Sequence, residues 1–179
     1  MKSSYIQNNY NLIFKTIVFL NSPKKIVEIG ILDGFALEAL CSTANKQCQI
    51  YAYDLFEDYE FSSSVYDDIE LKFSKQKNVH IKKADYKNIY KFHSDNSIDI
   101  LHIDISNNGD TYEYCLNKYM PKISQGGIVL LEGGSEERDQ YEWMNKFNFP
   151  KIRPIINKIK RKYTVHTLDA FPSLTIIKK

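Results

Sequence analysis

Residues 27–36 have the sequence VEIGILDGFA, and this stretch decides the fold class. A short apolar run ends in Glu28, Ile29 and Gly30, and a second glycine, Gly34, stands four residues later where a helical pattern begins. Glycine at position 30 lets the backbone turn tightly and approach a ligand without a Cβ atom in the way. The stretch therefore predicts the strand–turn–helix unit that opens a nucleotide-binding α/β fold.

Short apolar runs alternate with helical patterns along most of the chain. The expected strands are 25–30, 49–54, 78–85, 97–105 and 126–134, and the expected helices are 33–44, 64–75, 110–120 and 135–147. This alternation predicts a parallel sheet with right-handed crossovers. Two further strand-like runs, 163–168 and 173–178, flank a turn and predict an antiparallel hairpin. We expect a Rossmann-like, doubly wound α/β sheet of seven strands, mostly parallel, with a C-terminal antiparallel hairpin.

A length of 179 residues favours one domain, with a helical extension over 1–23 and a Rossmann-like core over 24–179. The apolar stretch 12–20 is interrupted by Lys15 and Thr16 and lacks a cleavage site, so it predicts an amphipathic helix and not a signal peptide. No apolar run is long enough for a membrane span.

The charge and the cysteines narrow the function classes. A formal net charge of +2 gives no electrostatic footprint for nucleic acid. The three cysteines form no CxxC pair, which favours a reduced, cytoplasmic setting.

Two acidic residues near the first turn separate the ligand classes. Asp54 ends the second expected strand, beside the first, where its carboxylate can accept hydrogen bonds from both ribose hydroxyls. Glu28 stands where a dinucleotide-binding fingerprint has its first glycine, and a carboxylate there repels a pyrophosphate. The same charge suits a ligand with a sulfonium and an ammonium group. The pattern thus favours an adenosine-bearing methyl donor over a dinucleotide.

The ordered set VEIGILDGFA, YAYD, KKAD, IDILHID and QGGIVLLEGG resembles the motifs of class I S-adenosylmethionine-dependent methyltransferases, in particular small bacterial O-methyltransferases of sugars and natural products. The resemblance covers 24–179 and implies S-adenosylmethionine as cofactor and a sugar, nucleotide sugar or natural product as acceptor. It implies that the donor is bound by Glu28, Gly30 and Gly34 at its methionine end, by Asp54 at the ribose, and by Asp85 and Tyr86 at the adenine. Asp33, in the same loop, is a further donor-binding candidate. Phe56 either lines the adenosine or is a core aromatic.

Asp104, at the end of the fourth expected strand, is the leading catalytic candidate. His102 lies on the same face of that strand, either as a general base or as a core histidine. In the enzymes that the chain resembles, an aspartate at this position often coordinates a divalent metal, so Asp104 and Glu132 are candidate ligands of Mg²⁺. A third ligand is missing, and the alternative is that Asp104 lines the donor pocket while Glu132 caps a glycine turn.

Several alternatives stay open at this point. Arg138 either binds a carboxylate or phosphate of the acceptor or forms a surface ion pair with Glu137 or Asp139. The pocket should be shallow, so either the acceptor is large and partly exposed or a second subunit, in a homodimer, closes the site. Besides a methyltransferase, the chain is consistent with a catalytically silent subunit that binds the donor and, less well, with a nicotinamide-dependent oxidoreductase.

Overall fold

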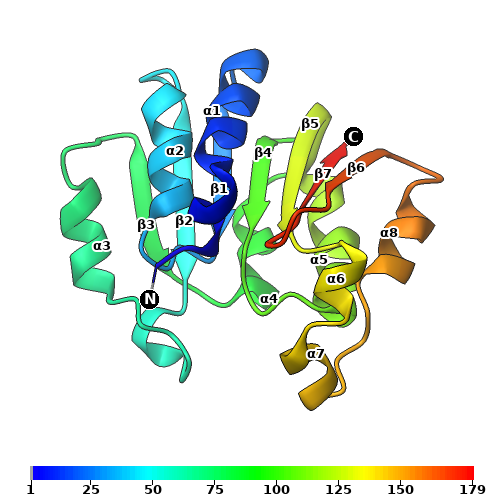
Figure 1. The fold of residues 1–179 in the computed structure, drawn as a ribbon. Helices are drawn as coiled ribbons and strands as arrows, with labels where there is room; N and C mark the ends of the chain where they lie inside the picture. The colour runs from blue at the N-terminus through cyan, green and yellow to red at the C-terminus, as the bar shows by residue number, and fades with distance from the viewer. Residues whose placement is uncertain (1) are drawn as a thin grey trace.

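The computed structural model describes residues 2–179, which contain a seven-stranded sheet (Figure 1). The strands are β1 (Lys25–Ile29), β2 (Gln49–Asp54), β3 (Val79–Lys83), β4 (Ile98–Ile103), β5 (Ile123–Glu132), β6 (Thr164–Leu168) and β7 (Leu174–Lys178). Their order in the sheet is β3-β2-β1-β4-β5-β7-β6. Strands β1 to β5 pair in parallel, and β7 is antiparallel to both β5 and β6. The expected sheet and C-terminal hairpin are confirmed.

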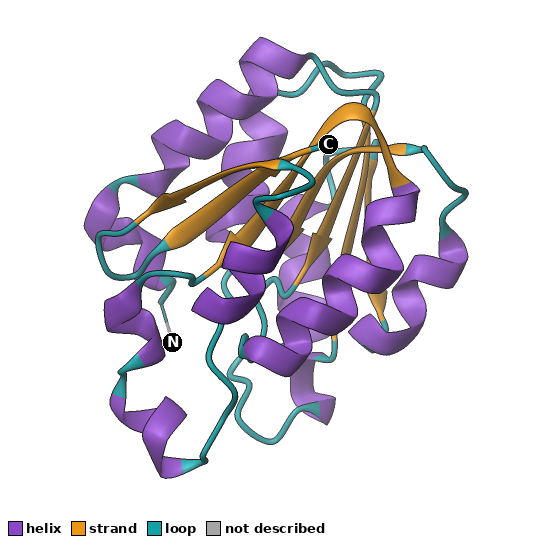
Figure 2. Cartoon of the chain, turned by 90° about the vertical axis from the view of Figure 1, so that its right-hand side faces the viewer, coloured by secondary structure: helices purple, strands orange, loops and turns teal. Residues whose placement is uncertain are grey.

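Helices cover both faces of this sheet (Figure 2). The α-helices are α1 (Tyr10–Asn21), α2 (Phe35–Thr43), α3 (Tyr66–Phe73), α4 (Tyr86–Ile89), α5 (Gly109–Tyr119), α6 (Glu136–Asp139), α7 (Glu142–Lys146) and α8 (Arg153–Ile159). The 3₁₀ turns are η1 (Ser4–Asn8), η2 (Phe56–Asp58), η3 (Tyr90–Phe92) and η4 (Met120–Lys122). Successive strand residues point to opposite faces, so Ile26 packs with α1 and α2 while Val27 packs with α5 and α8.

The N-terminal extension is helical: α1 packs beside α2 on one face of the sheet, and residues 3–10 lie along the edge at which β1 to β5 end. At one end the Ser3 backbone N–H donates to Asp33, 3.0 Å away. At the other end the Asn8 amide and the Tyr10 hydroxyl donate to the Ala170 carbonyl in the turn between β6 and β7. Residues 3–10 thus tie the loop after β1 to the C-terminal hairpin; Met1 lies outside the described residues.

One expectation about the C-terminal part was wrong. The predicted helix 135–147 is two short helices, α6 and α7, because Tyr141 takes an extended conformation between them. The Asp139 carboxylate at the end of α6 accepts the backbone N–H groups of Ile152 and Arg153, which fastens α6 to the start of α8. The segment 150–162, for which no helix or strand was predicted, contains α8. Ser135 is the N-cap of α6, since its hydroxyl accepts the Arg138 N–H.

Within residues 2–179, no helix is long and apolar enough to cross a membrane.

Candidate active site

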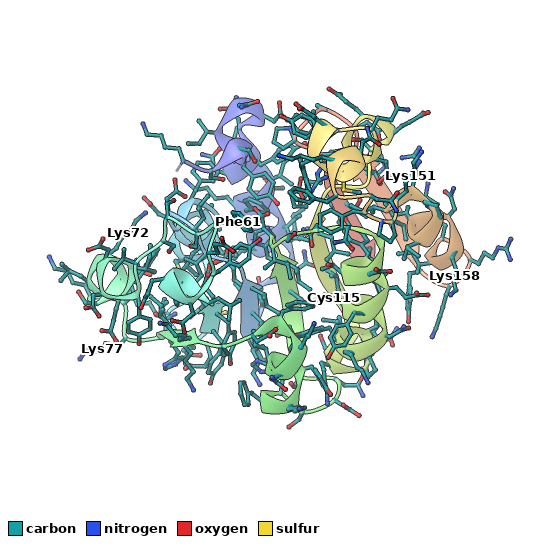
Figure 3. The ribbon with its side chains drawn as sticks, turned by 90° about the horizontal axis from the view of Figure 1, so that it is seen from below. Phe61, Lys72, Lys77, Cys115, Lys151 and Lys158 are labelled. Carbon is teal, nitrogen blue, oxygen red and sulfur yellow. The ribbon has the colours of Figure 1, made fainter. Side chains whose placement is uncertain are left out.

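Most of the candidate site residues lie at or just after the carboxyl ends of the parallel strands, on the edge seen from below in Figure 3. The loop after β1 turns at Gly30, which has a φ of +89°. A Cβ atom at position 30 would lie 1.9 Å from the Asp104 carbonyl oxygen, so no other residue fits between β1 and the end of β4. The glycine is therefore required by the close approach of two strands, in addition to any role near a ligand.

Asp54, at the tip of β2, holds the loop after β1 in place. One carboxylate oxygen accepts the backbone N–H of Ile31 at 2.6 Å and of Leu32 at 3.4 Å. The other oxygen accepts the N–H of Phe56 at 2.8 Å. The predicted ribose acid and the glycine turn are thus neighbours, as the sequence argument requires.

Asp85 and Tyr86 follow β3 on the same edge. The Asp85 side chain caps α4 by accepting the Lys87 N–H at 2.8 Å. The Tyr86 ring packs edge-on against Tyr114 of α5, with ring centroids 5.6 Å apart. Both residues are half-buried.

Glu28 does not face the loop, which corrects the sequence prediction. It lies inside β1, opposite His102 of β4, and both side chains are fully buried. The His102 Nδ1 atom lies 3.0 Å from the Glu28 Oε1 atom, and burial raises the pKa of Glu28. Because position 28 shares a face with Ile26, its side chain points under α1 and not toward the strand end.

His102 uses both ring nitrogens inside the protein, which favours the core interpretation over a general base. Its Nε2 atom lies 3.3 Å from the hydroxyl of Tyr5, a fully buried residue of η1. The Tyr5 hydroxyl also hydrogen-bonds the Asp104 carboxyl. Sequence reasoning missed Tyr5, since no motif marks a tyrosine that packs on a strand 97 residues away.

Asp104 follows β4 and is half-buried among acidic neighbours. Burial and, next, the negative charge of Glu132 raise the pKa of Asp104 to about 7. The positive charge of His102 and the Tyr5 hydroxyl oppose this rise. The carboxyl can therefore exchange a proton near neutral pH.

Comparison with known proteins decides the family. Residues 27–132, from the first strand to Glu132, match the family described as a methyltransferase domain. The chain belongs to this family. It is a class I, S-adenosylmethionine-dependent methyltransferase, and neither the silent subunit nor the oxidoreductase finds support. No protein with a curated description matches the chain.

Solved structures share the fold of this methyltransferase at low sequence identity. An O-methyltransferase from Bacillus cereus in complex with SAH (S-adenosylhomocysteine) has a TM-score of 0.69 and 16% identity, covering 99% of this chain and 83% of its own. The O-methyltransferase TomG from Streptomyces achromogenes has a TM-score of 0.69 and 13% identity, covering 99% and 81%. A methyltransferase from Geobacter sulfurreducens has a TM-score of 0.70 and 12% identity, covering 94% and 77%.

The residues proposed for Mg²⁺ do not fit a divalent cation. Both carboxylate oxygens of Glu132 are bound by the Arg138 guanidinium, at 2.9 and 3.1 Å. A second cation beside this guanidinium would be repelled. Among residues 2–179, no group of three His, Cys, Asp or Glu side chains could hold a metal ion. Asp104 and Glu132 are thus neighbours, but both oxygens of Glu132 are already paired with Arg138.

Phe56 was expected either to line the adenosine or to be a core aromatic. Phe56 is fully buried and packs against Tyr66 at 5.2 Å, so its surroundings are those of a core residue. Phe61, five positions further on, is 70% exposed and lies on the carboxyl edge of the sheet (Figure 3). An exposed phenylalanine there is a candidate contact for an adenine ring.

Proposed function

We propose that this methyltransferase transfers a methyl group from S-adenosylmethionine to a hydroxyl oxygen of a small polar acceptor, such as a sugar, a nucleotide sugar or another natural product. The observation that carries this proposal is the Asp104 carboxyl, half-buried after β4 with its pKa raised to about 7. A carboxylate with that pKa accepts a proton at neutral pH, as the deprotonation of a hydroxyl requires.

Donor binding is assigned to the loops after β1, β2 and β3. Each carboxylate oxygen accepts more than one hydrogen bond, so Asp54 can accept the ribose hydroxyls while it keeps its backbone partners. Asp85 uses one oxygen on the Lys87 N–H, which leaves the other for the adenine amine. Gly30, Asp33 and Gly34 form the turn assigned to the methionine end. Glu28 leaves this set because it is buried against His102.

S-adenosylmethionine, when bound, supplies a methyl group that is already activated, so catalysis depends mainly on alignment. Asp104 takes the proton of the acceptor hydroxyl while the acceptor oxygen is methylated. The products are the methyl ether and SAH. Tyr5 and His102 act behind Asp104 as positioning residues, since the Tyr5 hydroxyl connects the two side chains.

The experiment is a turnover assay with S-adenosylmethionine and a panel of hydroxyl, amine and carboxylate acceptors. We expect SAH to form only with hydroxyl acceptors, and Asp104→Asn to lower the rate at least about 100-fold with unchanged SAH affinity. Turnover of amines alone, or an Asp104→Asn variant as fast as the wild type, would contradict the proposal.

A further inference from the structure

Arg138 and Glu132 form a buried ion pair that sequence analysis did not predict. The Arg138 Nε atom donates to one Glu132 oxygen at 2.9 Å, and Nη2 donates to the other at 3.1 Å. Nη2 also donates to the Asn107 carbonyl, 3.2 Å away in the loop after β4. Arg138 is 4% exposed, so it is neither a surface pair with Glu137 or Asp139 nor an open anion site.

The Arg138 guanidinium also contacts an aromatic ring, in addition to the hydrogen bonds along its edge. Its central carbon lies 4.4 Å from the centroid of the Trp143 ring, and such stacking adds to the two hydrogen bonds. Two parallel hydrogen bonds fix the geometry of such a buried ion pair. Removal of one partner leaves the charge of the other buried and uncompensated. The charge in question is Glu132, which already raises the pKa of the neighbouring Asp104. One fixed positive charge therefore balances the acidic end of β4 and β5.

Two buried atoms beside the pair have no hydrogen-bond partner within residues 2–179: the Arg138 Nη1 donor and the Asn107 Oδ1 acceptor. An unpaired buried donor or acceptor is unfavourable, so a ligand group that pairs with either atom is stabilised there. A hydroxyl group accepts from an N–H and donates to an amide oxygen, whereas a carboxylate or phosphate can only accept. The unpaired atoms therefore match a hydroxyl.

We propose that Arg138 takes the place of a divalent cation in this methyltransferase: it neutralises Glu132 permanently and binds the acceptor hydroxyl through Nη1. The inference rests on the proposed function, whose base, Asp104, follows the strand next to Glu132. Activity then needs no added metal, and an acceptor whose reacting group is a carboxylate is disfavoured because that group meets Asn107 Oδ1 and the Asp104 carboxylate.

The test uses Mn²⁺ alone as a probe, titrated into the SAH-saturated protein and followed by electron paramagnetic resonance. The wild type should bind no Mn²⁺ with a dissociation constant below about 1 mM. Arg138→Met keeps a long, unbranched side chain but frees Glu132 beside Asp104, so this variant should bind Mn²⁺ at least about tenfold more tightly than the wild type. Arg138→Lys keeps the positive charge, so it should bind Mn²⁺ no more tightly than the wild type. Adding Glu132→Gln to Arg138→Met should abolish the gain in Mn²⁺ affinity.

Arg153→Gln is the matched control, since Arg153 is a second arginine nearby whose side chain contacts the Gly134 carbonyl and exposed Asp169. It should leave Mn²⁺ binding at the wild-type level. Mn²⁺ binding by the wild type that Glu132→Gln removes, or a folded Arg138→Met that binds none, overturns the proposal. Should Arg138→Met not fold, the wild-type and Arg138→Lys titrations decide.

Turnover separates this inference from the proposed function. Wild-type activity on hydroxyl acceptors should survive EDTA, and Arg138→Lys should lose at least about tenfold in rate at unchanged SAH affinity, because its ammonium cannot reproduce the planar contacts. If EDTA abolished turnover, or if Arg138→Lys kept the wild-type rate, the role of Arg138 would be wrong while the proposed function would stand. Failure of SAH to bind the wild type would instead remove the proposed function.

Discussion

The hydroxyl oxygen of Tyr5 lies 3.3 Å from the Nε2 atom of His102, although 97 residues separate the two in the chain. The other ring nitrogen, Nδ1, lies 3.0 Å from Glu28. When Asp104 is ionised, the Tyr5 hydroxyl donates to it and must accept from the Nε2–H of His102. Glu28, His102 and Tyr5 thus form a hydrogen-bonded chain that ends at Asp104.

Tyr5→Phe removes the last link of this chain. The hydroxyl lowers the pKa of Asp104, so its loss should raise that pKa and move the acidic limb of the pH–rate profile to higher pH. We expect roughly threefold to tenfold less activity at pH 6.5 and recovery by pH 9. Tyr10→Phe, which loses only a bond to the Ala170 carbonyl, should keep the wild-type profile. If the pH–rate profiles of Tyr5→Phe and Tyr10→Phe shifted by the same amount, the Tyr5 hydroxyl would not act on Asp104.

Glu28→Gln tests whether Glu28 touches the donor. Glutamine can keep a hydrogen bond to His102, and position 28 is fully buried, so the dissociation constant of SAH should change by less than about threefold. The melting temperature of this variant should change measurably, whereas its dissociation constant for SAH should not. A loss of SAH affinity of tenfold or more in a folded variant would restore Glu28 to the donor site.

Phe61→Ala should weaken SAH binding by roughly fivefold, because stacking on an aromatic ring contributes about 1 kcal/mol. Phe19→Ala is the control: Phe19 is equally exposed, at 72%, but lies near the end of α1, on the amino side of β1. Isothermal titration of both variants makes the comparison. Equal affinities for SAH would mean that Phe61 is only an exposed loop residue.

Stability should fall as the pH is lowered below neutral because of His93. Burial lowers the pKa of His93 from 6.5 to about 4, and its Nε2 atom lies 3.2 Å from the Tyr53 hydroxyl. Between these values the unfolded chain binds the proton and the folded chain does not, so stability is present above pH 6.5 and is lost below it. At pH 5 the loss is about 2 kcal/mol.

Urea unfolding of the wild type and of His93→Gln at pH 7.5 and pH 5 isolates this effect. The free energy of unfolding of the wild type should drop by about 2 kcal/mol more than that of His93→Gln over this range. Identical drops would show that other groups account for the acid sensitivity.

Site residues could be predicted from the sequence where their positions follow from local patterns. They could not be predicted where they depend on contacts between residues far apart in the chain. The strand ending at Gly30 and the acid at Asp54 were predictable because local periodicity places both at strand ends on one edge. The two-residue period also puts Glu28 on the face of Ile26, but only the fold reveals that α1 covers that face. The contacts of Tyr5 with His102 and of Arg138 with Glu132 join side chains across the sheet or across a turn, and no pattern in the sequence encodes them.

The break between α6 and α7 had a similar cause. The run 135–147 has helical periodicity, but Asp139 binds the backbone N–H groups of Ile152 and Arg153, and this tertiary contact outweighs local preference.

The most direct test of the central claim is a calorimetric titration of the wild type and of Asp54→Asn with SAH. The claim is that the turn after β1 and the acid at the tip of β2 hold an adenosine-bearing donor. It predicts one SAH bound per chain of the wild type, and a dissociation constant at least about tenfold larger for Asp54→Asn at equal helix content. No heat from the wild type, or equal affinity in the two proteins, would contradict it.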